Sequence, residues 1–421
     1  MKASRVRLGI LALMTAATML NYLDRSVMGV AKPALTEELR ISPATMGFIF
    51  SAFSWTYALA QIPGGAVLDR LGVRLTYAAS LVLWSVATFA HGLMTSVAGL
   101  FSARLALGLA EAPCYPSNSR ILNSWFPQVE RARATGVYSV GQYVGLGFLL
   151  PVLSWMAVAL GWRSLFFTVG AIGVAFGFGF WALYRDPGAH RRVSEAELRL
   201  IAEGGGQTAG VTATPFTLAN IGRLLSKRQV LGASLGQFCS NSTLVFFLTW
   251  FPSYLAEERG MDWIKSGFAA SLPYIAASVG VLLGGVVSDR IIRVSGSPSL
   301  GRKLPVIVGL LLTSTMIAAN YVQSNAIVIA IMSVAFFGQG MCNLGWTLIS
   351  DVAPRSMVGL TGGVFNLCAN LAGIVTPIVI GLVVQATGSF YGALAYVGAL
   401  GVIGALVYIF LLGPVERVEL A

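Results

Sequence analysis

The feature of this chain that most constrains its fold is a series of long apolar segments, which recurs along all 421 residues. A helix needs roughly 20 consecutive apolar residues to cross about 30 Å of hydrocarbon, and these segments reach that length. Charged residues make up only 11% of the chain, whereas soluble domains carry about 25%. We therefore predict an all-α membrane protein.

Twelve transmembrane helices account for the apolar segments. We place them at residues 8–31, 44–68, 75–96, 97–118, 132–158, 163–183, 229–255, 266–288, 304–322, 326–350, 359–385 and 389–413. The polar stretch 184–228 divides them six and six. The predicted domains are an N-terminal six-helix bundle at 1–183, a cytoplasmic linker at 184–228 and a C-terminal six-helix bundle at 229–421.

Both the linker and the N-terminus carry local signals. Ser194 and Glu197 have the spacing of a capping box, which predicts a short amphipathic helix through Ile201 that ends at the glycines 204–206. The N-terminus has basic residues before an apolar stretch, as a secretory signal does. That stretch continues to Ala31 without a cleavage site of small residues, so we expect an uncleaved first helix.

Lysine and arginine predict the orientation of the helices. With the N-terminus inside, the inner segments carry roughly four times as many basic residues as the outer loops, where we place Lys32, Arg40, Arg163, Arg259 and Lys265. Both termini and the linker are therefore predicted to face the cytoplasm. The net charge of +11 is spread over short loops, so we expect a lipid bilayer around the protein and no nucleic acid as a partner.

Two charged pairs lie inside the apolar segments: Asp24 with Arg25 in the first, and Arg104 with Glu111 in the fourth. Arg104 and Glu111 are two helical turns apart, which places both on one face, roughly 10 Å apart along the axis. A charge in a lipid-buried helix costs about 2.5–3.5 kcal/mol on insertion scales, so this face should line a protein or aqueous interior. Asp24 and Arg104 are each about seven residues from the outer ends of their helices, and we expect them to share a cavity.

These four side chains suit the coupled movement of a proton and an anion. Arginine stays charged and presents a planar fork to a carboxylate, so Arg25 and Arg104 are candidate ligands of an anionic substrate. A carboxylate in a site of low dielectric binds a proton more readily, so Asp24 and Glu111 are candidate proton carriers. A proton on either acid would free its arginine for the substrate. The alternative is a permanent structural salt bridge, although buried pairs seldom improve stability over apolar packing.

The second half of the chain offers uncharged polar groups instead. They are Gln237, Asn241, Asn343, Trp346, Asn366 and Asn370. Amides both donate and accept hydrogen bonds, as sugar hydroxyls require, so a carboxylate at one end and hydroxyls at the other describe a sugar acid. The alternative for each amide is a hydrogen bond between helices.

Other site chemistries find no support in the sequence. His91 and His190 have no partner at ligand spacing, and we expect both to be solvated loop residues. The four cysteines show no CxxC spacing, so neither a disulfide framework nor a metal site is predicted. The chain shows no nucleophile–base pair and no phosphate-cradling loop, so we predict neither an enzyme nor a cofactor: the proton gradient supplies the driving force.

The two halves also repeat. Gly65-Ala-Val-Leu-Asp69-Arg70 after the second span is echoed by Gly285-Val-Val-Ser-Asp289-Arg290 after the eighth. Such repetition indicates two similar bundles in parallel orientation with a central site between them. The first repeat resembles the signature loop of the major facilitator superfamily, and Arg104-Leu-Ala-Leu-Gly108 resembles its fourth-helix motif.

A narrower resemblance is carried by three further motifs. Asn21-Tyr-Leu-Asp24-Arg25, Gly108-Leu-Ala-Glu111-Ala-Pro113 and Phe247-Leu-Thr-Trp250-Phe-Pro252 resemble the anion:cation symporter family, and most closely its bacterial sugar-acid transporters. The resemblance implies that the proton-coupling residues are Asp24 and Glu111. It implies substrate-binding roles for Arg25, Tyr57, Arg104, Gln142, Gln237, Asn343, Trp346 and Asn366. It also implies that Asp69, Arg70, Asp289 and Arg290 gate the cytoplasmic side through ion pairs and helix ends.

The predicted function is uptake of a sugar acid, such as an aldonate, hexarate or hexuronate, by proton symport across a bacterial inner membrane. The transporter is expected to work by alternating access as a monomer. The alternative is an exchanger or exporter of the same fold that carries an organophosphate or another organic anion. In that case Asp24 and Glu111 would be structural.

Overall fold

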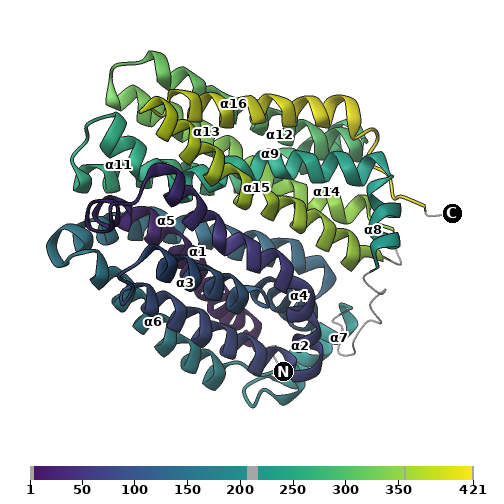
Figure 1. The fold of residues 1–421 in the computed structure, drawn as a ribbon. Coiled ribbons are helices and arrows are strands. Elements are labelled where there is room, and N and C mark those ends of the chain that lie inside the picture. The colour runs from purple at the N-terminus through teal and green to yellow at the C-terminus, as the bar shows by residue number, and fades with distance from the viewer. Residues whose placement is uncertain (1–3, 206–216, 355–356, 420–421) are drawn as a thin grey trace. The chain divides into compact units, whose positions relative to one another are not determined.

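The computed structural model describes residues 4–205, 217–354 and 357–419, and these residues form helices and connecting turns without strands (Figure 1). Eleven segments of the described residues are long and apolar enough to cross a membrane. The prediction of an all-α membrane protein is therefore confirmed. The linker residues 206–216, which include Gly206 of the predicted helix end, lie outside the described residues.

The first half contains six long or medium helices. They are α1 (Val6–Leu39), α2 (Pro43–His91), α3 (Val97–Glu111), α4 (Cys114–Trp125), α5 (Gln128–Leu160) and α6 (Trp162–Leu183). The predicted fourth span, 97–118, is divided into α3 and α4 near Pro113, which lacks the N–H that a continuous helix would use.

The predicted second and third spans are both contained in α2. The backbone leaves the helical conformation at Gly72, where φ is 74° and ψ is 168°. A residue without a Cβ adopts this positive φ at little cost, so one glycine makes the kink between the two helical parts. The second of the eleven candidate spans begins at Pro63, and the number of twelve spans stays a prediction.

The linker and the second half continue the helical pattern. Their elements are η1 (Pro187–Ala189), α7 (Glu195–Glu203), α8 (Leu218–Leu225), α9 (Arg228–Thr249), α10 (Phe251–Ser253), η2 (Tyr254–Glu258), α11 (Trp263–Ser295), α12 (Pro298–Ser314), η3 (Thr315–Tyr321), α13 (Asn325–Met341), η4 (Cys342–Leu344), α14 (Gly345–Val352), α15 (Val358–Thr387), α16 (Tyr391–Leu406) and η6 (Val407–Leu411). Several predicted spans are therefore composite, the tenth being built from α13, η4 and α14.

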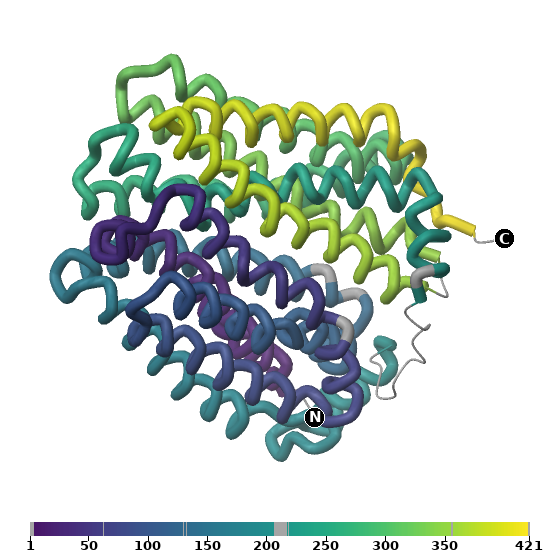
Figure 2. Tube along the Cα trace, in the orientation of Figure 1, coloured from purple at the N-terminus to yellow at the C-terminus, as the bar shows by residue number. Residues whose placement is uncertain are grey.

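The chain forms two compact units, which can be followed along the trace in Figure 2. The first unit comprises Met1–Val27, Ala52–Leu146 and Ala159–Val211. The second unit comprises Met28–Ser51, Gly147–Val158 and Thr212–Ala421. The boundaries thus fall inside helices α1, α2 and α5. The predicted division into bundles at 1–183 and 229–421 stays a prediction.

Each unit has its own apolar core. In the first unit, the buried rings of Tyr77, Trp84 and Phe180 belong to one cluster. In the second unit, Phe365 and Tyr408 belong to another. The second unit also holds the end of α1 beyond Met28: a Cβ on Gly29 would lie 2.7 Å from the main-chain oxygen of Leu248 on α9. Only glycine permits that close approach.

The linker helix α7 is attached to the start of α1. Ser194 caps α7 as predicted and accepts a hydrogen bond from the Glu197 N–H at 3.3 Å. The reciprocal half of the capping box is absent: the Ser194 N–H donates to Ser4 Oγ at 2.9 Å, and the buried Glu197 carboxylate turns to α1 instead. Glu197 accepts hydrogen bonds from the N–H and the guanidinium of Arg7, and Arg7 also pairs with Glu130 of α5 at 3.0 Å.

This attachment changes the chemistry of the Glu197 carboxyl. Burial alone would raise its pKa, but the hydrogen bonds from Ser4 and Arg7 outweigh burial and hold the pKa of Glu197 below its ordinary value. Glu197 therefore stays ionised and satisfies the N–H groups at the first turn of α1, which have no partner within their own helix.

Candidate functional site

The four predicted intramembrane charges lie together in the first unit, on α1 and α3. Asp24 and Arg104 are each 3% exposed and Glu111 is fully buried. On α3, Arg104 and Glu111 share the buried face with Leu107 and Gly108, as their spacing predicts. The charged side chains therefore face the protein interior.

Arg25 and Glu111 form a buried ion pair between α1 and α3. The Arg25 Nε donates to Glu111 Oε1 at 2.8 Å, and the Nη2 of the same guanidinium contacts that oxygen too. The guanidinium carbon lies 4.7 Å from the ring centroid of Phe53, 4.9 Å from that of Tyr57 and 5.1 Å from that of Tyr22. Three rings and one carboxylate thus hold the cation in place without using all its N–H donors.

Asp24 faces a different set of groups from its neighbour Arg25. Its carboxylate lies beside the Thr88 hydroxyl and the Trp84 indole of α2, within electrostatic reach of Arg104. Among the described residues, Asp24 Oδ1, Arg104 Nε and Glu111 Oε2 are buried and make no hydrogen bond. A buried polar atom without a partner costs about 1–3 kcal/mol. Each such atom in a native structure calls for an explanation, and a bound polar ligand is one that the predicted site would supply.

Two predicted binding residues join this cluster. Tyr57 stacks on Phe53 at a centroid distance of 5.1 Å and so forms part of the aromatic wall beside Arg25. Gln142 of α5 is buried, and its Oε1 lies 3.5 Å from the hydroxyl of Tyr115, which also donates to the Tyr22 hydroxyl at 3.1 Å. Tyr22 is within the Asn21–Arg25 motif, but Tyr115 was not predicted, because nothing in its local sequence marks it.

The prediction that His91 is a solvated loop residue is wrong. His91 is the last residue of α2 and only 1% exposed. Its ring stacks on Phe166 of α6 at 5.3 Å, and its Nδ1 lies 2.7 Å from the Ala87 carbonyl oxygen. The apolar packing of α6 against the end of α2 buries the ring. His190 is partly buried, with its ring edge-on to Trp125 at 5.6 Å.

The uncharged candidates of the second half lie in the second unit. Gln237 is buried, while Asn343, Trp346 and Asn366 are partly buried. Asn370 donates to the main-chain oxygen of Asn366, its neighbour one turn away, at 2.8 Å. The binding roles of these residues stay predictions.

Asn241 behaves differently, since its amide donates to the main-chain oxygen of Ala369 on α15. For Asn241 the structure thus shows a hydrogen bond between two helices, which was the alternative to substrate binding for each amide. Trp346 packs edge-on against Phe365 at 4.9 Å.

Comparison with known proteins assigns the family. The profile described as Major Facilitator Superfamily matches residues 14–301, a range that contains the whole charged cluster. The chain belongs to this superfamily. A D-galactonate transporter of Escherichia coli O6:H1 is 43% identical over 99% of this chain and 98% of its own length. A probable galactarate/D-glucarate transporter, GudP of Escherichia coli K12, is 39% identical over 100% of this chain and 96% of its own length.

A solved structure supports the fold of this superfamily member. A bacterial homologue of the human lysosomal transporter Spinster, in an inward-facing and occupied conformation, matches with a TM-score of 0.77 at 20% identity and covers 100% of both chains. The predicted resemblance to the superfamily and to sugar-acid transporters is confirmed. The protein is a multi-pass membrane transporter and not an enzyme.

The predicted gating residues of the transporter are exposed, Asp69 and Arg70 just before the kink of α2 at Gly72 and Asp289 and Arg290 in the last two turns of α11. In the first unit, Asp69 pairs with Arg120 at 3.0 Å. In the second unit, Asp289 lies 3.6 Å from Arg302, which also pairs with Asp351 at 3.0 Å. The partners come from later helices and could not be read from the motif, and the gating role stays a prediction.

The prediction that Lys32 lies in an outer loop is wrong. Lys32 lies within α1, and only 4% of its side chain is exposed. Its Nζ contacts Glu257 Oε1 at 2.6 Å and lies 5.1 Å from the Trp250 ring centroid. The helix continues past the apolar segment to Leu39, and the ion pair and the ring compensate the buried charge of the lysine.

Proposed function

We propose that this transporter takes up a sugar acid together with protons. The observation that carries the proposal is the Arg25–Glu111 ion pair, buried among three aromatic rings next to unpaired polar atoms of Asp24 and Arg104. Relatives that match along nearly the whole chain are named as transporters of galactonate, galactarate or glucarate. The coupling to protons is our inference from the chemistry of the cluster.

The proposed mechanism is competition for a cation. When Glu111 is ionised it occupies Arg25, and the substrate carboxylate has one arginine fewer to bind. When Glu111 takes up a proton, its attraction for Arg25 falls and the guanidinium fork becomes available to the substrate. Asp24 makes no ion pair with Arg104 but lies within its electrostatic reach, and a proton on Asp24 would weaken that attraction. Loss of the protons on the other side of the membrane restores the Arg25–Glu111 pair and the charge on Asp24, which favours release of the anion.

In this proposal, uncharged side chains bind the hydroxyl groups of the substrate. The hydroxyls of a sugar acid require both donors and acceptors, which Gln142 and Tyr115 provide in the first unit. Gln237, Asn343 and Asn366 are the proposed amide ligands of the second unit, and Trp346 is proposed to cover an apolar edge of the substrate. The cytoplasmic membrane of a bacterium is the proposed location.

Uptake into proteoliposomes tests the coupling. The purified chain is reconstituted, and uptake of labelled D-galactonate or D-glucarate is measured with and without an inward proton gradient, while an internal dye records pH. Symport predicts that the gradient accelerates uptake and that protons enter with the substrate. Indifference to the gradient, together with stimulation by internal anion, would instead identify an exchanger.

A binding screen narrows the substrate class. Thermal unfolding of the detergent-solubilised protein is measured with gluconate, galactonate, glucarate, glucuronate and galacturonate, and with sugar phosphates as the competing class. The proposal expects stabilisation by one or more sugar acids. Stabilisation by sugar phosphates alone would support the organophosphate alternative.

A further inference from the structure

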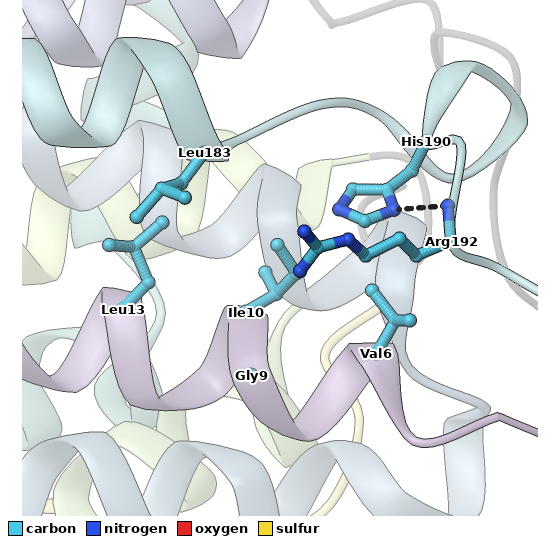
Figure 3. A pocket seen from close by; sticks show the side chains of 7 residues that line it. All are labelled: Val6, Gly9, Ile10, Leu13, Leu183, His190 and Arg192. Atoms are coloured by element: carbon cyan, nitrogen blue, oxygen red, sulfur yellow. Dashed lines mark hydrogen bonds between the residues drawn. The ribbon is translucent and has the colours of Figure 1, made fainter.

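A cavity lies in the first unit, away from the charged cluster, between the start of α1, the end of α6 and the following loop (Figure 3). Its volume is about 380 Å³, within the range of small-ligand sites. Its walls are almost entirely apolar, and its lining residues are Val6, Gly9, Ile10, Leu13, Leu183, His190 and Arg192. We refer to it as the α1–α6 groove.

The groove has a defined position relative to the membrane. Val6 is the first residue and Leu183 the last residue of two candidate membrane-spanning helices. Because both line the same cavity, the groove lies where the hydrocarbon ends at one membrane surface, which the distribution of lysine and arginine predicts to be the cytoplasmic one. Val6, Gly9, Ile10 and Leu13 follow one another on a single face of α1. Gly9 leaves the floor open, since a Cβ there would meet nothing within 4 Å.

A free positive charge stands over this apolar surface. Figure 3 shows the Arg192 side chain extended along the groove towards Ile10. Within the described part of the chain Arg192 has no carboxylate partner: its nearest acidic neighbours in sequence are engaged, Glu195 by Arg199 at 3.6 Å and Glu197 by Arg7 at 3.0 Å.

His190 adds a polar edge but no second charge. Its Nδ1 accepts a hydrogen bond from the Arg192 N–H at 3.3 Å, which requires that this ring nitrogen carry no proton. Burial, together with the nearby charges of Arg192 and Arg185, lowers the pKa of His190. The positive charge at the mouth of the groove is therefore that of Arg192.

We propose that the α1–α6 groove binds one anionic phospholipid, with an acyl chain along α1 and the phosphate at Arg192. The apolar walls match a hydrocarbon chain, and the unpaired guanidinium at the membrane surface matches a phosphodiester. Basic pockets at the cytoplasmic ends of membrane helices have the chemistry that selects anionic lipid headgroups. A free anion would need no apolar wall, and a zwitterionic lipid would bring its own cation to Arg192.

Native mass spectrometry of the full chain tests this proposal. Delipidated protein is incubated with phosphatidylglycerol or phosphatidylcholine, and bound lipid is counted as detergent and collision energy are raised. The wild type should retain one phosphatidylglycerol beyond the weakly bound lipids and should show no equivalent phosphatidylcholine. Arg192→Gln should weaken the retained lipid roughly fivefold, the effect of one basic residue near an anionic surface.

Two further variants separate a lipid seated in the groove from a lipid held only by surface charge. Gly9→Phe fills the space beside Gly9 in the groove without changing any charge and should weaken retention at least as much as Arg192→Gln, with Gly9→Val as a smaller replacement if folding suffers. Arg191→Gln removes an exposed neighbouring charge outside the groove lining and should leave retention unchanged.

The outcomes decide between occupants. Weaker retention in Gly9→Phe and Arg192→Gln, but not in Arg191→Gln, supports the proposal. Equal losses in Arg191→Gln and Arg192→Gln would show diffuse surface attraction and overturn it. Displacement of the lipid by inorganic phosphate, or normal retention in a folded Gly9→Phe protein, would overturn it as well. None of these readouts depends on which substrate is transported.

Discussion

Replacing Glu111 by glutamine should tighten substrate binding and weaken its dependence on pH, because only Asp24 then remains to titrate in the charged cluster. In the wild type, a substrate carboxylate must displace Glu111 Oε1 from both Nε and Nη2 of Arg25. The amide of glutamine fills the same space without the negative charge. The three rings around Arg25 are unchanged by the substitution, so the guanidinium should stay in position for the substrate.

The size of the effect follows from this competition. Hydrogen bonds to charged groups are worth about 1.5–3 kcal/mol net. If the substrate no longer has to replace one such bond, its affinity should rise by roughly 10- to 100-fold at alkaline pH, where wild-type Glu111 is ionised. As pH falls, wild-type Glu111 takes up its proton and the affinities of the two proteins should converge. In the absence of substrate the variant should be less stable, since breaking a buried ion pair costs about 3–5 kcal/mol.

Isothermal titration calorimetry between pH 5.5 and 8.5 measures both trends in detergent. Counterflow in proteoliposomes supplies the functional comparison: Glu111→Gln should exchange substrate yet fail to accumulate it along a proton gradient. Glu130→Gln is the matched control, because Glu130 also pairs with an arginine but lies on α5, outside the charged cluster. Loss of binding in folded Glu111→Gln protein, or an unchanged wild-type pH dependence, would refute the competition between Glu111 and the substrate for Arg25.

Three other perturbations test separate parts of the structure. Arg104→Ala should abolish measurable binding of the sugar acid in the same titration, and an unchanged affinity would remove Arg104 from the site. The pKa of Glu197 is lowered in the folded state, so its contribution to stability is present above the ordinary carboxyl pKa and is lost as pH falls through the lowered value. Glu197→Gln should therefore reduce the unfolding temperature most at neutral pH and least in acid. An equal reduction at every pH would contradict this. Glu257→Gln should destabilise the protein by about 3 kcal/mol, because it leaves the charge of Lys32 buried without a partner. Lys32→Met leaves only the half-exposed Glu257 and should change the unfolding temperature little. A larger loss of stability in Lys32→Met than in Glu257→Gln would be inconsistent with the burial of the pair.

The charged cluster could be predicted because helical periodicity alone places its members. Arg104 and Glu111 are two turns apart, and lipid excludes both from the outer face of a helix, so a common buried face is the remaining arrangement. Helical periodicity could not predict which side chains of other helices contact these groups. Trp84 and Thr88 approach Asp24 from α2, and local sequence does not record which helices become neighbours.

The errors have the same origin. His91 has no polar partner nearby in sequence, which favours a solvated residue, whereas packing against Phe166 buries it at the end of α2. Glu197 fits the spacing of a capping box, yet its carboxylate is taken by the first turn of α1, 190 residues away in sequence. In both cases a contact between distant segments outweighs a local preference.

Helix α1 carries two ion pairs. Arg25, bound to Glu111, and Lys32, bound to Glu257, are two turns apart, about 10 Å along the axis. The boundary between the compact units crosses α1 between them, after Val27. Each unit therefore takes one of its buried cations from the same continuous helix, and neither unit can be cut from the chain without dividing α1.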